Sequence, residues 1–205
     1  MPSSWDDGRL AYAEAAAWFV DTVALVDDRW HDPALGEWDV RALVGHTSRS
    51  FVTVESYLAR PADAVAIGST ADYYRATREM AATGAGVAER GQEAGRALGQ
   101  DPLASVSALA NHVVELVGTL DGTELLTTIA GGMRLVEYLP TRSFEFVVHT
   151  LDLRCALGAS LDVPARPAAA ALGLVSELAV GDGVAGPLLL AATGRGGLPD
   201  GFSVL

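Results

Sequence analysis

The chain has 205 residues, half of them hydrophobic, and a formal net charge of −12 at pH 7. This length suits one core with an appendage, and the charge argues against binding to nucleic acid or an anionic membrane surface. The single cysteine, Cys155, excludes an internal disulfide. With no signal-peptide pattern and no long apolar run, we expect a cytoplasmic protein without a membrane span. The apolar neighbours of Cys155 predict a buried, inert thiol.

Apolar residues at helical spacing predict a mainly helical fold over the first 120 residues. Asp39 and Asp101 are good N-caps, and Pro102 suits the first turn of a helix. A loop is expected over 29–37, between the first two helices. The four helices are expected over 6–28, 39–60, 71–98 and 102–120.

The period of the pattern changes after residue 120. Two short runs, 124–130 and 133–139, flank Gly131-Gly132 and predict a β-hairpin. The hairpin leads into an apolar helix expected over 140–158, which should be buried because it is apolar nearly all round. Further helices are expected over 168–179 and 184–192, before an irregular glycine-rich segment, 193–205.

A polar stripe crosses the apolar helix expected over 140–158. Its members, Arg142, Glu145, His149 and Asp152, are three, four and three residues apart and therefore share one face. Burying these ionisable groups costs several kcal/mol unless partners satisfy them. A divalent cation would do so economically, because Glu145 and His149 at i and i+4 project in parallel.

A third ligand is available from another helix. His46 lies on the helix expected over 39–60, among small or polar neighbours that leave room around its ring. Two histidines and one glutamate are the ligand set of an open zinc site, whose fourth position takes water or substrate. Asp152 or Asp39 could accept the other ring N–H of a ligating histidine. His112 is interpreted as an ordinary helix histidine.

A salt-bridge network is the alternative interpretation of the stripe. In it, Arg142, Glu145 and Asp152 pair with one another and fix the register of the helix without a metal. Glu145→Ala would then leave a buried arginine without its partner and destabilise the protein. Residue chemistry alone favours neither interpretation.

Two segments carry a family resemblance. WDVRALVGH, residues 38–46, and TRSFEFVVHTLDLRCALG, residues 141–158, resemble the signature segments of the mycothiol-dependent maleylpyruvate isomerase family, an actinobacterial branch of the DinB/YfiT-like metal-binding bundles. The resemblance implies a four-helix bundle that binds one divalent metal, usually zinc, through His46, Glu145 and His149. Arg142 and Asp152 would support these ligands from one turn away.

The resemblance also implies a chemistry. In such enzymes the open metal position binds the thiol of mycothiol and lowers its pKa, so that the thiolate adds to an electrophilic small molecule. The expected class is therefore a mycothiol-dependent isomerase or S-transferase. The resemblance also implies that the isomerase of this family has a second domain, which contributes an arginine near the active site. Whether Arg195, in segment 193–205, has such a role is left open. A non-catalytic metal-binding or regulatory bundle is the alternative.

Domain organisation and partners follow from the same pattern. We expect a DinB-like bundle over 1–158 and a helical extension over 159–205 that packs on the same domain. The expected partners are a small-molecule thiol and an electrophilic substrate, with no nucleic acid and no membrane. The sequence leaves open whether the extension covers the site or forms a contact in a homodimer.

Overall fold

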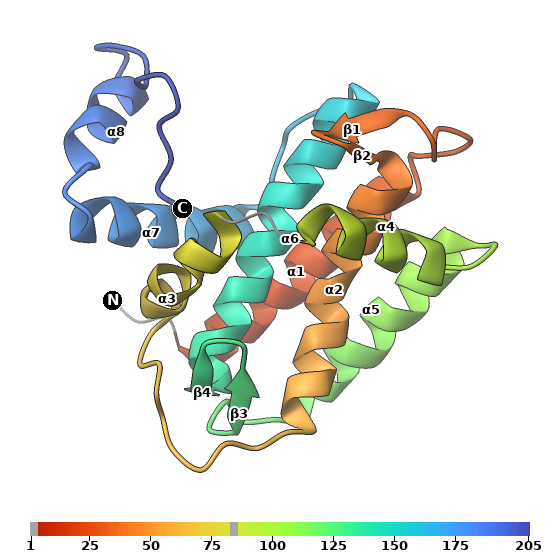
Figure 1. Ribbon diagram of the computed structural model, residues 1–205, viewed down its shortest axis with the longest axis horizontal. Coiled ribbons are helices and arrows are strands. Elements are labelled where there is room, and N and C mark those ends of the chain that lie inside the picture. Colours follow the sequence, from red (N-terminus) through yellow and green to blue (C-terminus); the bar gives the residue numbers. More distant parts are fainter. Residues whose placement is uncertain (1–3, 83–85) are drawn as a thin grey trace.

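The computed structural model describes residues 4–82 and 86–205, and they form a mainly helical structure around a four-helix bundle (Figure 1). In the bundle, α1 and α2 each pack against both α5 and α6. Aromatic rings fill its centre, where the rings of Phe51 and Phe146 lie 4.6 Å apart and those of Phe19 and Phe146 lie 5.6 Å apart. The expected helical bundle is confirmed. Its helices are α1 (Trp5–Val23), α2 (Val40–Leu58), α5 (Pro102–Gly118) and α6 (Leu135–Leu157).

The predicted capping residues set the ends of these helices. The side chain of Asp39 accepts a hydrogen bond from the Ala42 N–H at 2.8 Å, and that of Asp101 accepts one from the Ala104 N–H at 3.0 Å. Each bond satisfies a donor that the first turn of a helix leaves unpaired. Gly158 ends α6 in the left-handed conformation, with φ of 63°.

The first helix ends earlier than expected. α1 stops at Val23 instead of residue 28, and Asp27 takes a left-handed φ of 54° in the turns that follow. The predicted loop over 29–37 contains a short strand, β1 (Pro33–Leu35), which pairs antiparallel with β2 (Trp38–Asp39) just after it. This ribbon leads the chain directly into α2.

The single helix expected over 71–98 is two helices, α3 (Thr70–Ala82) and α4 (Val87–Ala97), so that prediction is wrong; residues 83–85 lie outside the described residues. The glycines of α4 permit a close approach to α2. A Cβ on Gly45 of α2 would lie 2.1 Å from the Gly95 nitrogen. A Cβ on Gly91 would lie 2.6 Å from the Trp38 ring.

The expected hairpin is present with a different turn. β3 (Leu125–Thr128) pairs with β4 (Gly131–Arg134), so residues 129–130 form the turn and the Gly131-Gly132 pair belongs to the second strand. Gly132 is required for another reason. A Cβ there would lie 2.0 Å from the Ala64 carbonyl oxygen, in the segment that crosses the hairpin.

The helix that carries the polar stripe begins five residues before Pro140. The second strand was expected to reach residue 139, but it ends at Arg134 and α6 starts at Leu135. Pro140 therefore lies inside the helix instead of at its start. It has no N–H, so it cannot donate to the carbonyl of Val136 one turn earlier. The Thr70 hydroxyl donates to the neighbouring Glu137 carbonyl at 2.8 Å.

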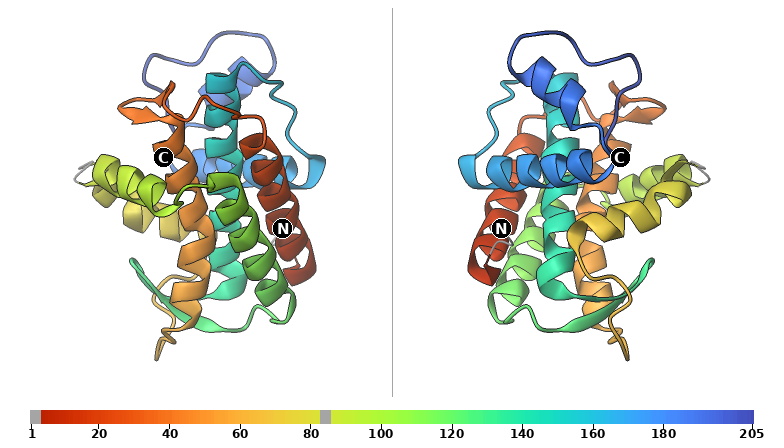
Figure 2. Two further views of the ribbon diagram at one scale, coloured as in Figure 1. Left: turned by 90° about the vertical axis from the view of Figure 1, so that its right-hand side faces the viewer. Right: turned by 90° about the vertical axis from the view of Figure 1, so that its left-hand side faces the viewer.

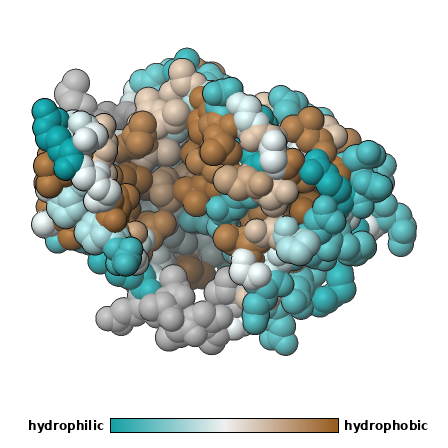
Figure 3. Space-filling model, turned by 90° about the horizontal axis from the view of Figure 1, so that it is seen from above, coloured by the Kyte–Doolittle hydropathy of each residue, from teal (hydrophilic) through white to brown (hydrophobic). Residues whose placement is uncertain are grey.

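The C-terminal helices lie at one side of the bundle. α7 (Ala165–Gly181) runs across α1 and α6, as the views in Figures 1 and 2 agree. It buries Leu174 and Leu178. α8 (Ala185–Ala192) has no buried residue and projects from the end of α7. Viewed from above, the molecule is hollowed and apolar side chains surround the hollow (Figure 3). No helix among the described residues combines the length and apolar character needed to cross a membrane.

Candidate metal centre

Two bundle helices bring the three predicted ligands together. α2 carries His46, and α6 carries Glu145 and His149 one turn apart. Each of these side chains offers one ligand atom, and the three atoms lie within 4.8 Å of one another. These residues could therefore hold one metal ion. Three protein ligands would leave a fourth position for a small molecule.

His149 is held between two carboxylates. Its Nε2 lies 3.3 Å from Glu145 Oε2, and its Nδ1 lies 3.0 Å from Asp152 Oδ2. Burial by itself would lower the pKa of His149, but the hydrogen bonds and charges of Asp152 and Glu145 raise it to about 9. The contact with Asp152 orients the ring so that Nε2 points toward Glu145, the arrangement expected of a carboxylate behind a ligating histidine.

Glu145 is held in its ionised form. Burial would raise its pKa, but the hydrogen bond with His149 and the charge of Arg142 lower it to about 2. Tyr74 of α3 also contributes, because its hydroxyl donates to Glu145 Oε1 at 2.9 Å. No pattern in the sequence indicated Tyr74, since α3 belongs to a different part of the chain and the contact depends on how that helix packs.

His46 has the properties of a neutral ligand. Its ring lies 4.5 Å from the ring of Trp38 and 4.9 Å from that of His149, between centroids. Burial and the charge of His149 lower the pKa of His46 to about 4. Its Nδ1 is buried, and within the described residues no hydrogen-bond partner reaches it. A buried ring nitrogen without a partner is costly unless something binds the ring, so the donor set fits a metal ion.

Asp39 does not support His46. One of its carboxylate oxygens caps α2, and the other lies 3.4 Å from Nδ1 of His31. Asp152 and Asp39 were the two carboxylates predicted as possible partners of a ligating histidine. In the structure Asp152 contacts His149, whereas Asp39 contacts His31. Trp38, which stacks on His46, also donates from Nε1 to the Ala88 carbonyl at 3.1 Å and so ties the site to α4.

Arg142 is not part of the expected ion-pair network. Its guanidinium lies 5.2 Å from the ring centroid of Tyr138 and 5.7 Å from that of Tyr73, and its Nε donates to Thr141 Oγ1 at 2.9 Å. Within the described ranges, both Glu145 and Asp152 form their ion pairs with His149. The alternative interpretation, in which Arg142 pairs with the two carboxylates, does not match these contacts, because the arginine stacks on aromatic rings and acts on Glu145 through its charge.

Three other predicted residues lie elsewhere. His112 is exposed on α5 and lies 3.0 Å from Glu55, which agrees with an ordinary helix histidine. Cys155 is exposed, so the prediction of a buried thiol is wrong; it occupies a solvent-facing position of α6. Arg195 is exposed in the C-terminal segment and donates to the Thr193 carbonyl at 3.4 Å.

The fold and the site define a DinB-like helical domain with a candidate metal centre built from two histidines and a glutamate. The chain belongs to the family described as mycothiol maleylpyruvate isomerase N-terminal domain, whose sequence model matches residues 12–154. Searches of curated proteins and of solved structures found no match. The matched range contains all three candidate ligands and Asp152.

The contact between Asp152 and His149 predicts an effect on metal affinity. Asp152→Ala removes the carboxylate that orients the His149 ring, and we expect metal affinity to fall by about 10- to 100-fold. Asp152→Asn, whose amide oxygen can still accept from Nδ1, should restore part of the affinity. Isothermal titration with zinc measures both, with the exposed Asp63→Ala as control. Equal affinities for Asp152→Ala and the wild type would show that Asp152 does not support the ligand.

Proposed function

We propose that this chain is a zinc-dependent, or other divalent-metal-dependent, enzyme that activates a low-molecular-weight thiol for reaction with an electrophilic small molecule. Mycothiol is the proposed thiol, and isomerisation or S-transfer is the proposed reaction. The observation that carries the proposal is the convergence of His46, Glu145 and His149 within 4.8 Å in a chain of the mycothiol maleylpyruvate isomerase N-terminal domain family.

The protonation states of two of the three side chains support metal binding, whereas His149, whose pKa is raised to about 9, must first lose a proton. His46 is neutral near pH 7 because its pKa is lowered to about 4, and Glu145 is ionised because its pKa is lowered to about 2. Neutral imidazole and carboxylate are the forms that bind borderline divalent ions. When bound, such an ion would lower the pKa of a coordinated thiol so that the thiolate predominates near neutral pH.

The residues around the ligands keep them in position. Asp152 accepts from Nδ1 of His149, which leaves Nε2 directed toward Glu145. The Tyr74 hydroxyl donates to Glu145 Oε1, leaving Oε2 beside His149. The ring of Trp38 covers one side of His46. Locked side chains of this kind favour a fixed geometry, which an open metal site needs in order to hold a substrate in a productive orientation.

Thiol binding provides the test of this function. Zinc-loaded protein is expected to bind mycothiol and a simpler thiol, 2-mercaptoethanol, in calorimetric titrations, whereas the metal-free His46→Ala variant is not. Cobalt-substituted protein gives a second readout, because a thiolate on cobalt produces a charge-transfer band. The exposed His112→Ala variant serves as control. The proposal would be contradicted if metal-loaded wild type gave neither a calorimetric heat of thiol binding nor the charge-transfer band of a thiolate on cobalt.

A non-catalytic metal-binding or regulatory role is the second candidate. The observation that favours it is that the ligands come from two core helices, so an ion would tie α2 to α6 and stabilise the bundle in proportion to its affinity. This role predicts a large fall in melting temperature on chelation without turnover of any thiol and electrophile pair. Thiol conjugation by the loaded protein would exclude it.

Metal binding should depend on pH through one proton. Between about pH 5 and 9, His149 is the only one of the three side chains that must lose a proton to bind a metal, because its pKa is about 9 and those of His46 and Glu145 are about 4 and 2. A metal must displace that proton, so apparent affinity should fall about tenfold for each unit by which pH is lowered. Calorimetry in buffers of different ionisation enthalpy should count about one proton released; none or two would contradict this assignment.

A further inference from the structure

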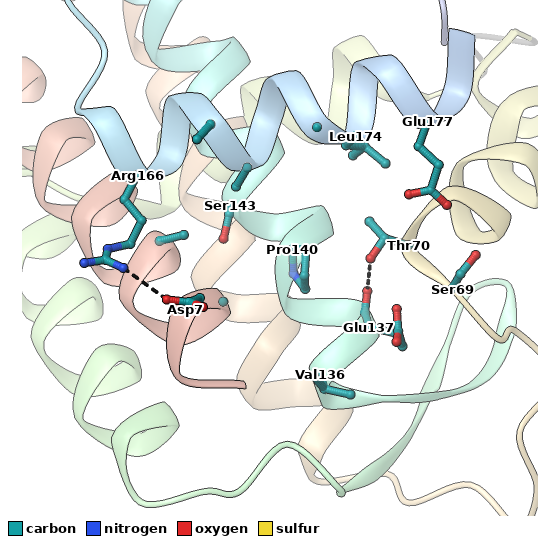
Figure 4. A pocket seen from close by; sticks show the side chains of 15 residues that line it. Asp7, Ser69, Thr70, Val136, Glu137, Pro140, Ser143, Arg166, Leu174 and Glu177 are labelled. Carbon is teal, nitrogen blue, oxygen red and sulfur yellow. Dashed lines mark hydrogen bonds and ion pairs between the residues drawn. The ribbon is translucent and has the colours of Figure 1, made fainter. Parts of the chain in front are cut away.

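A cavity lies apart from the candidate metal centre. Helices α1, α6 and α7 and residues 69–70 at the start of α3 line an open cavity of about 780 Å³, and none of the three candidate ligands lines it. This volume is in the range of small-molecule sites. In Figure 4, α7 runs over the cavity, with Pro140 and Ser143 of α6 below it. The cavity could therefore take a ligand without disturbing the bundle.

The middle of the cavity is apolar. Pro140 contributes from α6, and the side chain of Leu174 contributes from α7. Gly173 leaves space beside them, because nothing would lie within 4 Å of a Cβ at that position. Such a lining favours the apolar body of a ligand, which gains free energy when it leaves water.

Charges at one end of the cavity are balanced within the protein. Arg166 of α7 lies 2.9 Å from Glu14 and 3.3 Å from Asp7, so both carboxylates of α1 have a cationic partner. Figure 4 places Arg166 and Asp7 together at this end. A charged ligand would have to break these pairs to bind here.

The carboxylates at the other end have no such partner. Glu137 of α6 and Glu177 of α7 lie at this end of the cavity (Figure 4), and neither forms an ion pair within the part of the chain that the structure describes. The neighbouring Arg75 is engaged by Asp72 and Asp182. Burial and the charge of Glu177 raise the pKa of Glu137, despite a hydrogen bond from the Thr70 backbone.

A backbone carbonyl next to Glu137 in the chain lacks its usual donor. Because Pro140 has no N–H, the Val136 carbonyl lacks the donor that residue i+4 of a helix normally supplies. Val136 and Glu137 are adjacent in the chain, and both line the cavity. This end of the cavity therefore offers two carboxylates, beside a turn of α6 in which one carbonyl lacks its usual donor.

We propose that the cavity binds a small organic cation with a primary ammonium group on an apolar body. The ammonium lies between Glu137 and Glu177, and the body packs against Pro140 and Leu174. An ammonium has three N–H donors, a positive charge and no acceptor, which matches two carboxylates without an ion pair at one end of an apolar cavity. A neutral alcohol lacks the charge, and a quaternary ammonium lacks the donors.

The test uses benzylammonium as probe, with benzyl alcohol and benzyltrimethylammonium as matched compounds. Because an amine could also bind a metal, titrations followed by NMR chemical shifts use metal-free wild type and the metal-free His46→Ala variant. Benzylammonium should bind both proteins equally, and at least about tenfold more tightly than either matched compound, as expected for charge-assisted hydrogen bonds. The shifted resonances should belong to residues of α6 and α7 around the cavity.

Variants locate the contact. Glu137→Gln and Glu177→Gln should each weaken benzylammonium binding by about tenfold or more, whereas Glu37→Gln, the same charge change in an exposed loop, should not. Gly173→Phe places a ring at the cavity and should abolish binding. Far-UV circular dichroism checks that each variant is folded.

Two results would overturn the proposal. One is the absence of saturable benzylammonium binding to wild type up to about 10 mM, a concentration that covers weak small-molecule sites. The other is equal affinity for benzylammonium and benzyl alcohol, which needs no variant and would show that the carboxylates do not select the ligand. Neither result depends on the candidate metal centre, so failure here leaves the proposed thiol chemistry untouched.

Discussion

Replacing His149 with alanine is expected to abolish metal binding. Wild-type protein purified without a histidine tag should contain about one zinc or similar ion per chain, and His149→Ala should contain none. The physical reason is that Glu145 and His46 alone cannot form the three-ligand set, and loss of one ligand should lower affinity by at least about 100-fold. Elemental analysis of metal per chain, beside titration of the metal-free proteins, measures the effect.

A second variant separates ligand loss from damage to the fold. His149→Ala also removes the partner of two carboxylates, so it can destabilise the metal-free protein. His46→Ala leaves the contacts of His149 with Glu145 and Asp152 intact and should still lose the metal. His112→Ala, which changes an exposed histidine of α5, should keep it.

Metal content also decides between the two interpretations of the polar stripe. If wild type held no metal even after reconstitution with zinc, the ion pairs of His149 with Glu145 and Asp152 would serve only to stabilise the fold. Glu145→Ala would then destabilise the protein by leaving His149 with a single carboxylate, and chelators would have no effect. The thiol chemistry proposed above would not apply.

Gly45→Ala is expected to destabilise the protein strongly. The new Cβ would lie 2.1 Å from the Gly95 nitrogen and 2.5 Å from the Ala94 carbonyl carbon, both backbone atoms of α4. Since backbone cannot move aside like the end of a side chain, α4 must shift away from α2. We expect the free energy of unfolding to fall by about 3 kcal/mol, measured by urea denaturation of the metal-free protein.

The same substitution should weaken metal binding. The Ala88 carbonyl of α4 accepts a hydrogen bond from Trp38, and the Trp38 ring packs on His46. A displacement of α4 should therefore loosen the packing of Trp38 against this candidate ligand. Gly173→Ala is the matched control, because nothing lies within 4 Å of a Cβ in the middle of α7; there, alanine should stabilise the protein by about 0.5 to 1 kcal/mol. Equal stability of Gly45→Ala and the wild type would show that the two helices are not in close contact.

Much of the bundle and of the candidate site could be predicted locally. The spacing of Glu145, His149 and Asp152 places them on one face of a helix whatever surrounds it. Asp39 and Asp101 cap helices because a short carboxylate reaches the free N–H groups of the following turn. Predictions of this kind depend on residues within four positions of one another, and these were confirmed.

Errors occurred where distant segments override local preference. Pro140 suits a helix start, but α6 continues back to Leu135, where the chain leaves the β3–β4 hairpin. Gly131-Gly132 suits a turn, yet Gly132 is needed because the Ala64 carbonyl lies against it. Arg142 was interpreted either as support for the ligands or as part of a salt-bridge network, and neither interpretation included its stacking on Tyr73 and Tyr138. Each outcome depends on packing between elements.

The sequence by itself determined which side chains share a helix face, where the bundle helices are capped, and that His46, Glu145 and His149 could form one ligand set. Only the tertiary structure decided that α2 and α6 bring these atoms within 4.8 Å, that Tyr74 and Trp38 support them, and that a separate cavity lies beneath α7. The reason is that helical periodicity fixes directions along one element, whereas distances between elements follow from how close their side chains and glycines allow the backbones to approach.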